Sequence, residues 1–395
     1  MSETGDNKLN LLNLERYSKP LILVGGVLLA ICIAGGMANK DDFYRSYLVA
    51  FLFWLGVTLG CLAVLMVQHL TGGQWAFIIR RILEAGTRTL PLMALAALPI
   101  LFGMKTLYVW DQPGQTDPAI VGKHMYLNSG FFTARMILYF VVWFLLVHFL
   151  NKWSRQEDSH ATPNVWIRME NLSGIGLVIY AVTISFASVD WVMSIEPRWY
   201  STIYGMLFMV GQALAAMAFS VTVLIWLSDR KPFSESITPT HFQDLGSFLL
   251  VFVMLWAYLE FSQFLITWGG NLSGEIPWYV YRMRGVWGAV GLMLVLGSFA
   301  LPFFLLLFRH IKRRKKWLLV VAGLILLMRL VDMYWMVLPA FGRGDAHLTW
   351  MNVALPLGMG GIWFAYFTRQ LQRMPALAIH DPRMEGVAKH AAGHE

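Results

Sequence analysis

Long apolar runs recur along almost the whole chain, and polar residues are confined to short stretches between them. A helix needs about 20 mostly apolar residues to cross the hydrocarbon core of a bilayer, and it satisfies its own backbone hydrogen bonds there. Ten segments meet this requirement: residues 20–37, 47–70, 90–109, 131–150, 172–192, 202–227, 246–268, 286–308, 317–338 and 351–367. The pattern therefore predicts an all-α, polytopic transmembrane protein of about ten helices.

The polar stretches divide the chain into three parts. Residues 1–19 form an expected cytoplasmic N-terminal segment, residues 20–367 a single transmembrane domain, and residues 368–395 a cytoplasmic tail. The third apolar segment follows an amphipathic stretch, residues 75–88, which either lies on the membrane surface or extends the helix.

Composition agrees with lipid as the solvent, because 57% of residues are hydrophobic and only 14% are charged, against about 25% charged in soluble domains. The two cysteines, Cys32 and Cys61, both lie inside apolar segments, and no CxxC or CxxCH motif occurs. Iron–sulfur clusters, zinc sites and c-type haem are excluded on ligand count. The chain is therefore expected to bind no electron-carrying cofactor of its own.

The net charge of +8 reflects topology rather than nucleic-acid binding, since the basic residues lie between the apolar segments. Counted over alternate loops, 21 of the 31 Lys and Arg residues fall on one side of the membrane and 8 on the other. The positive-inside rule then predicts that both termini are cytoplasmic. The basic run at residues 309–316 is read as a topology determinant that touches anionic headgroups.

Five ionisable residues fall inside predicted spans, where a charge costs several kcal/mol and usually marks a pair, a proton route or a substrate route. They are Arg135, Asp190, Glu260, Arg329 and Asp332. The helix directions place all five in the non-cytoplasmic half. We expect this group to be the working part of the membrane domain.

Spacing suggests partners within the group. Arg329 and Asp332 are three residues apart, so they share a helical face and are expected to form an intrahelical ion pair. Glu260, Gln263 and Thr267 form a polar stripe along one face of their helix, which favours a proton-relay or ligand role for Glu260.

Other polar residues leave alternatives open. Asp190 is either an interfacial cap or the outer end of a proton path. On the cytoplasmic side, His69 and His148 suggest a haem ligated by both rings, but both lie at the membrane edge, which favours ordinary interfacial histidines. Together with Gln68 and Asn151 they form an inner polar set. The inner and outer sets together suggest two half-channels.

Three stretches carry a family resemblance: residues 53–60 (FWLGVTLG) with 68–75 (QHLTGGQW), residues 189–197 (VDWVMSIEP) with 199–202 (WYST), and residues 276–279 (IPWY). They resemble the polysulfide-reductase, or NrfD-like, membrane subunits, and most closely the shorter of the two copies in alternative complex III, a bacterial quinol:cytochrome c oxidoreductase. The resemblance implies two four-helix bundles with flanking helices, in the inner membrane of a bacterium. It also implies partners that carry the electrons: multihaem and monohaem cytochrome c subunits, an iron–sulfur subunit, a longer paralogous membrane subunit and small membrane subunits.

One departure from that expectation concerns quinol oxidation. No histidine lies in the outer half of any predicted span, and only His124 and His347 occur in the outer loops. The resemblance therefore favours the longer paralogue as the site of quinol binding.

The first hypothesis is thus a subunit of such a complex in which Asp190, Glu260 and Asp332 carry protons while Arg135 and Arg329 tune them. A second is a secondary transporter that works alone, although clear inverted repeats and paired broken helices are missing from the sequence. A third is a purely structural anchor whose buried charges merely pair.

Overall fold

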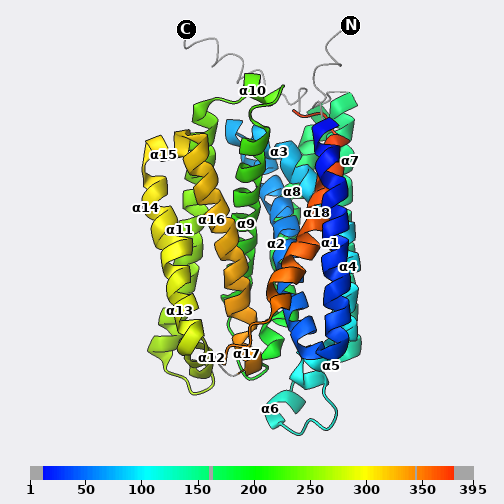
Figure 1. The fold of residues 1–395 in the computed structure, drawn as a ribbon, viewed down its shortest axis with the longest axis vertical. Helices are drawn as coiled ribbons and strands as arrows, with labels where there is room; N and C mark the ends of the chain where they lie inside the picture. Colours follow the sequence, from blue (N-terminus) through cyan, green and yellow to red (C-terminus); the bar gives the residue numbers. More distant parts are fainter. Residues whose placement is uncertain (1–11, 160–162, 343–344, 378–395) are drawn as a thin grey trace.

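The computed structural model describes residues 12–159, 163–342 and 345–377, and within these all regular structure is helical. Most of the long helices run along one common axis (Figure 1). In the described part of the chain, eight helices are long and apolar enough to cross a membrane, and a bent pair raises the number to nine. The chain is a polytopic helical membrane protein, as predicted.

The long helices coincide with the predicted apolar segments. They are α1 (Leu12–Ala38), α2 (Lys40–Thr71), α7 (Ser129–Ser159), α8 (Pro163–Trp191), α9 (Tyr204–Leu227), α11 (Pro239–Gly270), α16 (Lys315–Val337) and α18 (Trp350–Gln372). Two further segments are each built from consecutive pieces: α3 (Gln74–Thr87) with α4 (Leu90–Phe102), and α13 (Gly285–Leu294), η3 (Val295–Ala300) and α14 (Leu301–Leu307).

Short helices occupy the connections. They are α5 (Met104–Leu107), η1 (Val109–Asp111), α6 (Pro118–Val121), η2 (Met193–Ile195), α10 (Phe233–Ser236), α12 (Ile276–Arg282), α15 (Arg309–Arg313) and α17 (Pro339–Gly342). We call the end of the bundle where α1 begins and α18 ends the proximal end, and the opposite end, with α6 and α12, the distal end (Figure 1).

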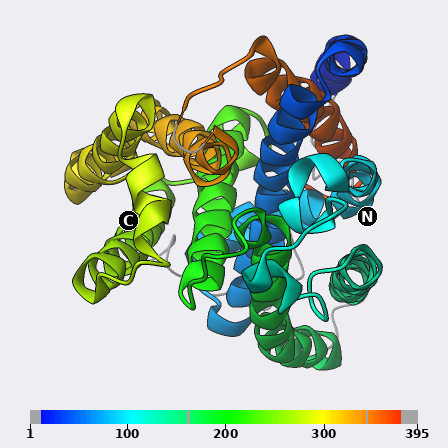
Figure 2. The same ribbon diagram turned by 90° about the horizontal axis from the view of Figure 1, so that it is seen from below.

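Two four-helix groups form the body, as expected. One contains α2, α4, α7 and α8, and the other contains α9, α11, α13–α14 and α16 (Figure 2). They meet where α2 packs on α9, and a Cβ at Gly60 would lie only 2.0 Å from the carbonyl oxygen of Gln212. The glycine pair Gly56 and Gly60 thus lets the two backbones approach closely.

The tenth predicted span, residues 351–367, lies in α18, which is not among the candidate membrane spans. Asn352, Pro356 and several glycines lower its hydropathy, so the prediction of about ten spans becomes eight or nine by length and apolarity. α18 packs mainly along α1. A Cβ at Gly25 would meet the carbonyl oxygen of Gly358 at 2.7 Å, so glycines set the spacing of this pair.

The amphipathic stretch before α4 does not lie on the surface. Arg80 and Arg81 of α3 are 0% and 1% exposed, and α3 continues into α4 through a bend of 40°. α3 and α4 thus form a bent pair, and the polar face of α3 points into the protein.

Candidate functional site

Charged side chains lie inside the bundle at both ends. The distal half holds all five ionisable residues expected from the sequence, from Arg135 in α7 to Asp332 in α16. The proximal end holds a second group, centred on α3, that the sequence reading did not identify. The distal residues form two separate groups.

The first distal group, the α7–α8 ion pair, joins Arg135 to Asp190. The Arg135 guanidinium donates from Nε to Asp190 Oδ2 at 2.9 Å and from Nη2 to Oδ1 at 2.8 Å. Tyr139 donates its hydroxyl to Asp190 Oδ2 at 2.7 Å, and Arg135 Nη1 donates to the carbonyl of Tyr126 at 3.0 Å. Asp190 is 1% exposed. Both of its carboxylate oxygens are engaged in bonds that hold α7 to α8.

The second distal group, the α11–α16 cluster, contains Glu260, Arg329 and Asp332. Arg329 Nη1 donates to Asp332 Oδ2 at 2.5 Å within α16, which confirms the predicted intrahelical pair. Glu260 of α11 lies within electrostatic reach of both residues. Its Oε1 atom is enclosed and has no hydrogen-bond partner in the described structure. The cluster therefore contains two carboxyl groups but only one of them is paired.

α11 positions Glu260 through well-defined ends. Its first turn carries a capping box in which Thr238 and His241 bond each other's backbone. Its last turn stops at Asn271, which adopts the left-handed conformation with φ 49°. Along the predicted polar stripe, Gln263 accepts a hydrogen bond from the Ser201 hydroxyl and donates to Thr267 Oγ1 at 3.4 Å.

A buried arginine outside the spans borders this cluster. Arg282 of α12 donates to the carbonyl oxygens of Trp335 and Met336 at 3.1 and 2.7 Å, and to Glu196 Oε2 at 2.9 Å. Its guanidinium lies 3.7 Å from the ring centroid of Trp278. Burial lowers the pKa of Arg282, and the Glu196 carboxylate opposes that shift.

Arg282 and Glu196 were not among the predicted site residues, because both fall in loops rather than in apolar segments. A signal was present, since Glu196 belongs to the stretch at residues 189–197 and Trp278 to the stretch at residues 276–279, both of which carry the family resemblance. The structure brings these stretches together: Trp199 and Trp278 stack with centroids 4.6 Å apart.

A small cavity of about 20 Å³ lies beside Arg329, between α2, α9 and α16. Gln212 and Gly211 of α9 also line it, and Gln212 Oε1 accepts a hydrogen bond from Tyr180 at 2.7 Å. A Cβ at Gly211 would lie 2.0 Å from Arg329 Nη2, so this glycine makes room for the guanidinium. The volume suits about one water molecule.

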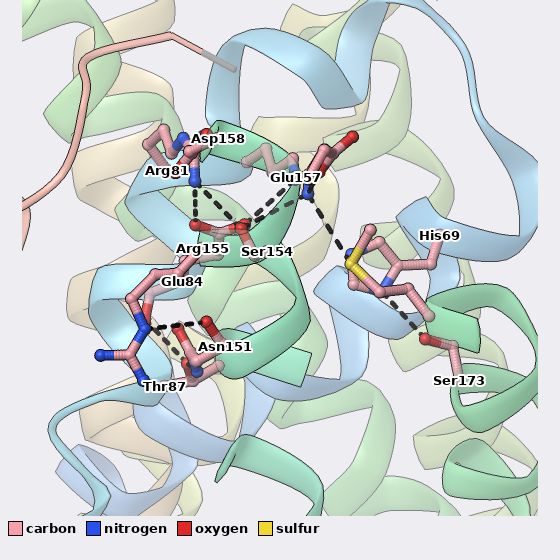
Figure 3. Close-up of polar contacts among 12 residues, drawn as sticks. His69, Arg81, Glu84, Thr87, Asn151, Ser154, Arg155, Glu157, Asp158 and Ser173 are labelled. Carbon is pink, nitrogen blue, oxygen red and sulfur yellow. Dashed lines mark hydrogen bonds and ion pairs between the residues drawn. The ribbon is translucent and has the colours of Figure 1, made fainter. Parts of the chain in front are cut away.

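At the proximal end, a network of buried ion pairs ties α3 to the end of α7 (Figure 3). Glu84 Oε1 accepts from Arg80 Nε at 3.0 Å and from Ser154 at 2.7 Å, while its Oε2 accepts from Arg81 Nη1 at 2.7 Å. Arg80 also pairs with Glu157, and Arg81 also pairs with Asp158. Glu84 is 1% exposed, so three charges share one buried site. We call these residues the proximal network.

The inner polar residues expected from the sequence do not lie together. Asn151 accepts from Arg88 Nε at 2.7 Å and donates to Thr87, so it joins the proximal network. His69 is buried, with Nδ1 2.9 Å from the Ser173 hydroxyl of α8. His148 is exposed on α7 and contacts the ring of Phe149. The two histidines therefore do not share one pocket.

Among the residues that the structure describes, no group of three or more His, Cys, Asp or Glu side chains could hold a metal ion. Cys32 and Cys61 are free and buried.

No family model and no curated protein matches the chain.

Proposed function

We propose that the chain is a proton-conducting membrane subunit of a respiratory quinol:cytochrome c oxidoreductase of the alternative complex III type. Partner subunits carry the electrons in haem c and iron–sulfur clusters, and quinol binds in the longer paralogous subunit. The family resemblance of three sequence stretches supports the complex, and the buried carboxyl groups support the proton role.

The unpaired Glu260 oxygen is the observation that carries the proton role. Glu260 is half-buried, with its Oε1 atom enclosed. A carboxyl group with a free oxygen can accept and release a proton without first breaking a hydrogen bond. Charges of both signs lie near it, Asp332 on one side of the balance and Arg329 and Arg282 on the other. Such opposing influences are typical of groups that exchange protons.

Asp190 receives a different role in this proposal. Its two oxygens are occupied by Arg135 and Tyr139, so taking up a proton would disrupt the bond between α7 and α8. We therefore assign Asp190 and Arg135 to structure, and Glu260 with Asp332 to proton transfer.

The route on the proximal side begins, in this proposal, at the proximal network. Arg88, Asn151 and Thr87 continue it into the membrane domain, and a Thr89–Thr58 hydroxyl contact of 2.8 Å extends it to α2. The small cavity at Arg329 would then hold a water molecule between this route and the α11–α16 cluster.

The test uses the Glu260→Gln variant of the complete complex, purified and reconstituted in vesicles. Haem content reports assembly, and protons moved per electron during quinol oxidation report conduction. We expect normal haem content with fewer protons per electron. The matched control is Glu235→Gln, because Glu235 is exposed and forms only a surface pair with Lys231.

Other results would point to the remaining hypotheses. An unchanged proton-to-electron ratio in assembled Glu260→Gln would support a structural anchor and remove the relay role. Purification of the wild-type chain alone, without haem-containing subunits, would favour a secondary transporter.

A further inference from the structure

The connection between α14 and α16 is strongly basic, with six Lys or Arg residues and one His within residues 309–316. Residues 309–313 form α15 at the proximal end of the bundle, and α16 begins at Lys315 (Figure 1). The sequence identifies this run as a topology determinant. In the structure, some of these side chains bond within the protein and others do not.

Three of the basic side chains bond to other segments of the chain. They are Arg309, which donates to Gln243 at 2.9 Å, Lys312, which donates to Ser247 at 3.1 Å, and Lys315, which pairs with Asp229 at 2.7 Å. Among the described residues, Asp229 is the only carboxylate that pairs with the run. Arg314 and Lys316 are exposed and form no ion pair in this part of the chain. Two cationic groups are therefore available to a partner.

These two charges lie at the end of a helix that disfavours them. Arg314 directly precedes α16, Lys316 lies in its first turn, and that turn contains no acidic residue. The N-terminus of a helix carries a partial positive charge, so cations are unfavourable there and anions are favourable. α2 has the opposite arrangement, with Asp41 and Asp42 in its first turn. The start of α16 thus has an excess of positive charge that an external anion would offset.

The same end of α16 carries an exposed apolar face. Trp317, Val320 and Leu327 are 49%, 60% and 55% exposed, and their spacing places them along one side of the helix. Lys316 lies four residues before Val320, so it stands at the proximal end of that face. Tryptophan is typical of the boundary between headgroups and hydrocarbon. The two free cations therefore lie at headgroup level, next to a surface that faces acyl chains.

We propose that Arg314 and Lys316 bind the phosphate of one anionic phospholipid, whose acyl chains lie along the face of α16 that contains Trp317 and Val320. A soluble anion would leave this apolar face uncovered, and a zwitterionic lipid would bring its own ammonium group to the cationic pair. The bias of basic residues assigns the proximal end to the cytoplasmic leaflet, where anionic lipids attract basic segments. The site is independent of the proton role of Glu260.

The experiment compares lipids bound to the purified, delipidated protein, with its accompanying subunits, by native mass spectrometry. The probes are dioleoyl phosphatidylglycerol and dioleoyl phosphatidylcholine, which share acyl chains and differ in headgroup charge. One basic side chain near an anionic surface changes affinity about fivefold. We expect the wild-type protein to prefer phosphatidylglycerol, and the double variant Arg314→Gln with Lys316→Gln to lose about ten- to thirtyfold of that preference.

Three comparisons keep the result interpretable. The double variant Arg314→Lys with Lys316→Arg keeps both charges and should keep the preference. Lys19→Gln with Arg373→Gln removes two exposed charges from the proximal ends of α1 and α18, and should leave the preference almost unchanged. Higher salt should weaken the preference of the wild-type protein, and this measurement does not depend on the insertion of any variant.

Several outcomes would overturn the proposal. Equal binding of the two lipids by the wild-type protein would show that headgroup charge is not recognised. An unchanged preference in Arg314→Gln with Lys316→Gln would place the anionic lipid elsewhere. An equal fall in Lys19→Gln with Arg373→Gln would show a general attraction to the basic end of the bundle. Retention of an acidic protein segment over Arg314 and Lys316, with no phosphatidylglycerol, would assign these charges to a protein partner.

Discussion

Arg135 of α7 and Asp190 of α8 face each other through two parallel hydrogen bonds of 2.9 and 2.8 Å. This two-pronged geometry is the strongest form of an arginine–carboxylate pair. Because Arg135 also meets the ring of Tyr126 at 3.8 Å and the Tyr126 carbonyl, the pair fixes the distal ends of two helices and the loop before them.

Removing one partner of this pair should destabilise the protein. Asp190→Asn leaves the buried Arg135 charge uncompensated, so we expect the free energy of unfolding to fall by about 3–5 kcal/mol. Denaturant titration of the purified protein measures the change. The double variant Arg135→Met with Asp190→Leu leaves no unpaired charge, so it should recover most of the lost free energy of unfolding. If the double variant were as unstable as Asp190→Asn, the unpaired Arg135 charge would not be the cause of the loss.

A methyl group at Gly211 should displace Arg329. The added Cβ would lie 2.0 Å from Nη2, and overpacking of this kind costs about 1–3 kcal/mol. Gly323→Ala in α16 is the control, because nothing lies within 4 Å of that Cβ, and it should be neutral or slightly stabilising. Thermal unfolding of the two variants distinguishes them, and similar melting temperatures would contradict the close contact.

Loss of the Glu84 charge should destabilise the protein more than loss of an exposed ion pair. Glu84→Gln removes the charge shared by Arg80 and Arg81, so the free energy of unfolding should fall by about 3–5 kcal/mol. Asp229→Asn, which breaks the exposed pair with Lys315, should change it by about 0–1 kcal/mol. An equal fall in the free energy of unfolding in both variants would show that the buried network stabilises the protein no more than an exposed ion pair does.

The bias of basic residues predicts the orientation of the bundle. With the proximal end in the cytoplasm, a green fluorescent protein fused to the C-terminus should fluoresce, and alkaline phosphatase inserted at residues 112–116 should be active. The reverse pattern would place the proximal end outside the cytoplasm.

A distal loop contact predicts a dependence on pH. Hydrogen bonds from Arg198 and from the backbone of Ala119 lower the pKa of Asp117. The contact therefore stabilises the loop above the ordinary aspartate pKa, and this contribution is lost as pH falls through the lowered value. Hydrogen exchange of α6, corrected for intrinsic rates, should increase in that acidic range. Arg198→Gln should move the increase to higher pH, and an unmoved transition would exclude the Arg198 effect.

Apolar periodicity predicted the fold well because lipid imposes a simple rule on every span. It also predicted that Arg329 and Asp332 would pair, since an i, i+3 spacing within one helix needs no tertiary information. It also predicted the helix at α18, whose Asn352 and Pro356 lower its hydropathy and are tolerated because α1 and α2 cover them, including a 2.9 Å bond from Asn352 to Ser46.

The charges of α3 could not be placed from sequence by the same reasoning. Arg80, Arg81 and Glu84 on an amphipathic helix are what a solvated face also presents. Their burial depends on partners from the end of α7, among them Glu157 and Asp158. The i, i+3 and i, i+4 spacing inside α3 could have indicated the ion pairs within that helix. The sequence gives no comparable signal for the partners on α7, which lie more than 70 residues along the chain.

The glycine-lined contact between α1 and α18 joins the first and the last long helices of the chain. During synthesis, α1 enters the bilayer long before its main partner exists, and only 17% of its apolar window is buried even in the finished protein. Until residues 350–372 have been synthesised, α1 therefore has only its smaller contact with α2. A chain that stops before residue 350 would lack the main packing partner of α1.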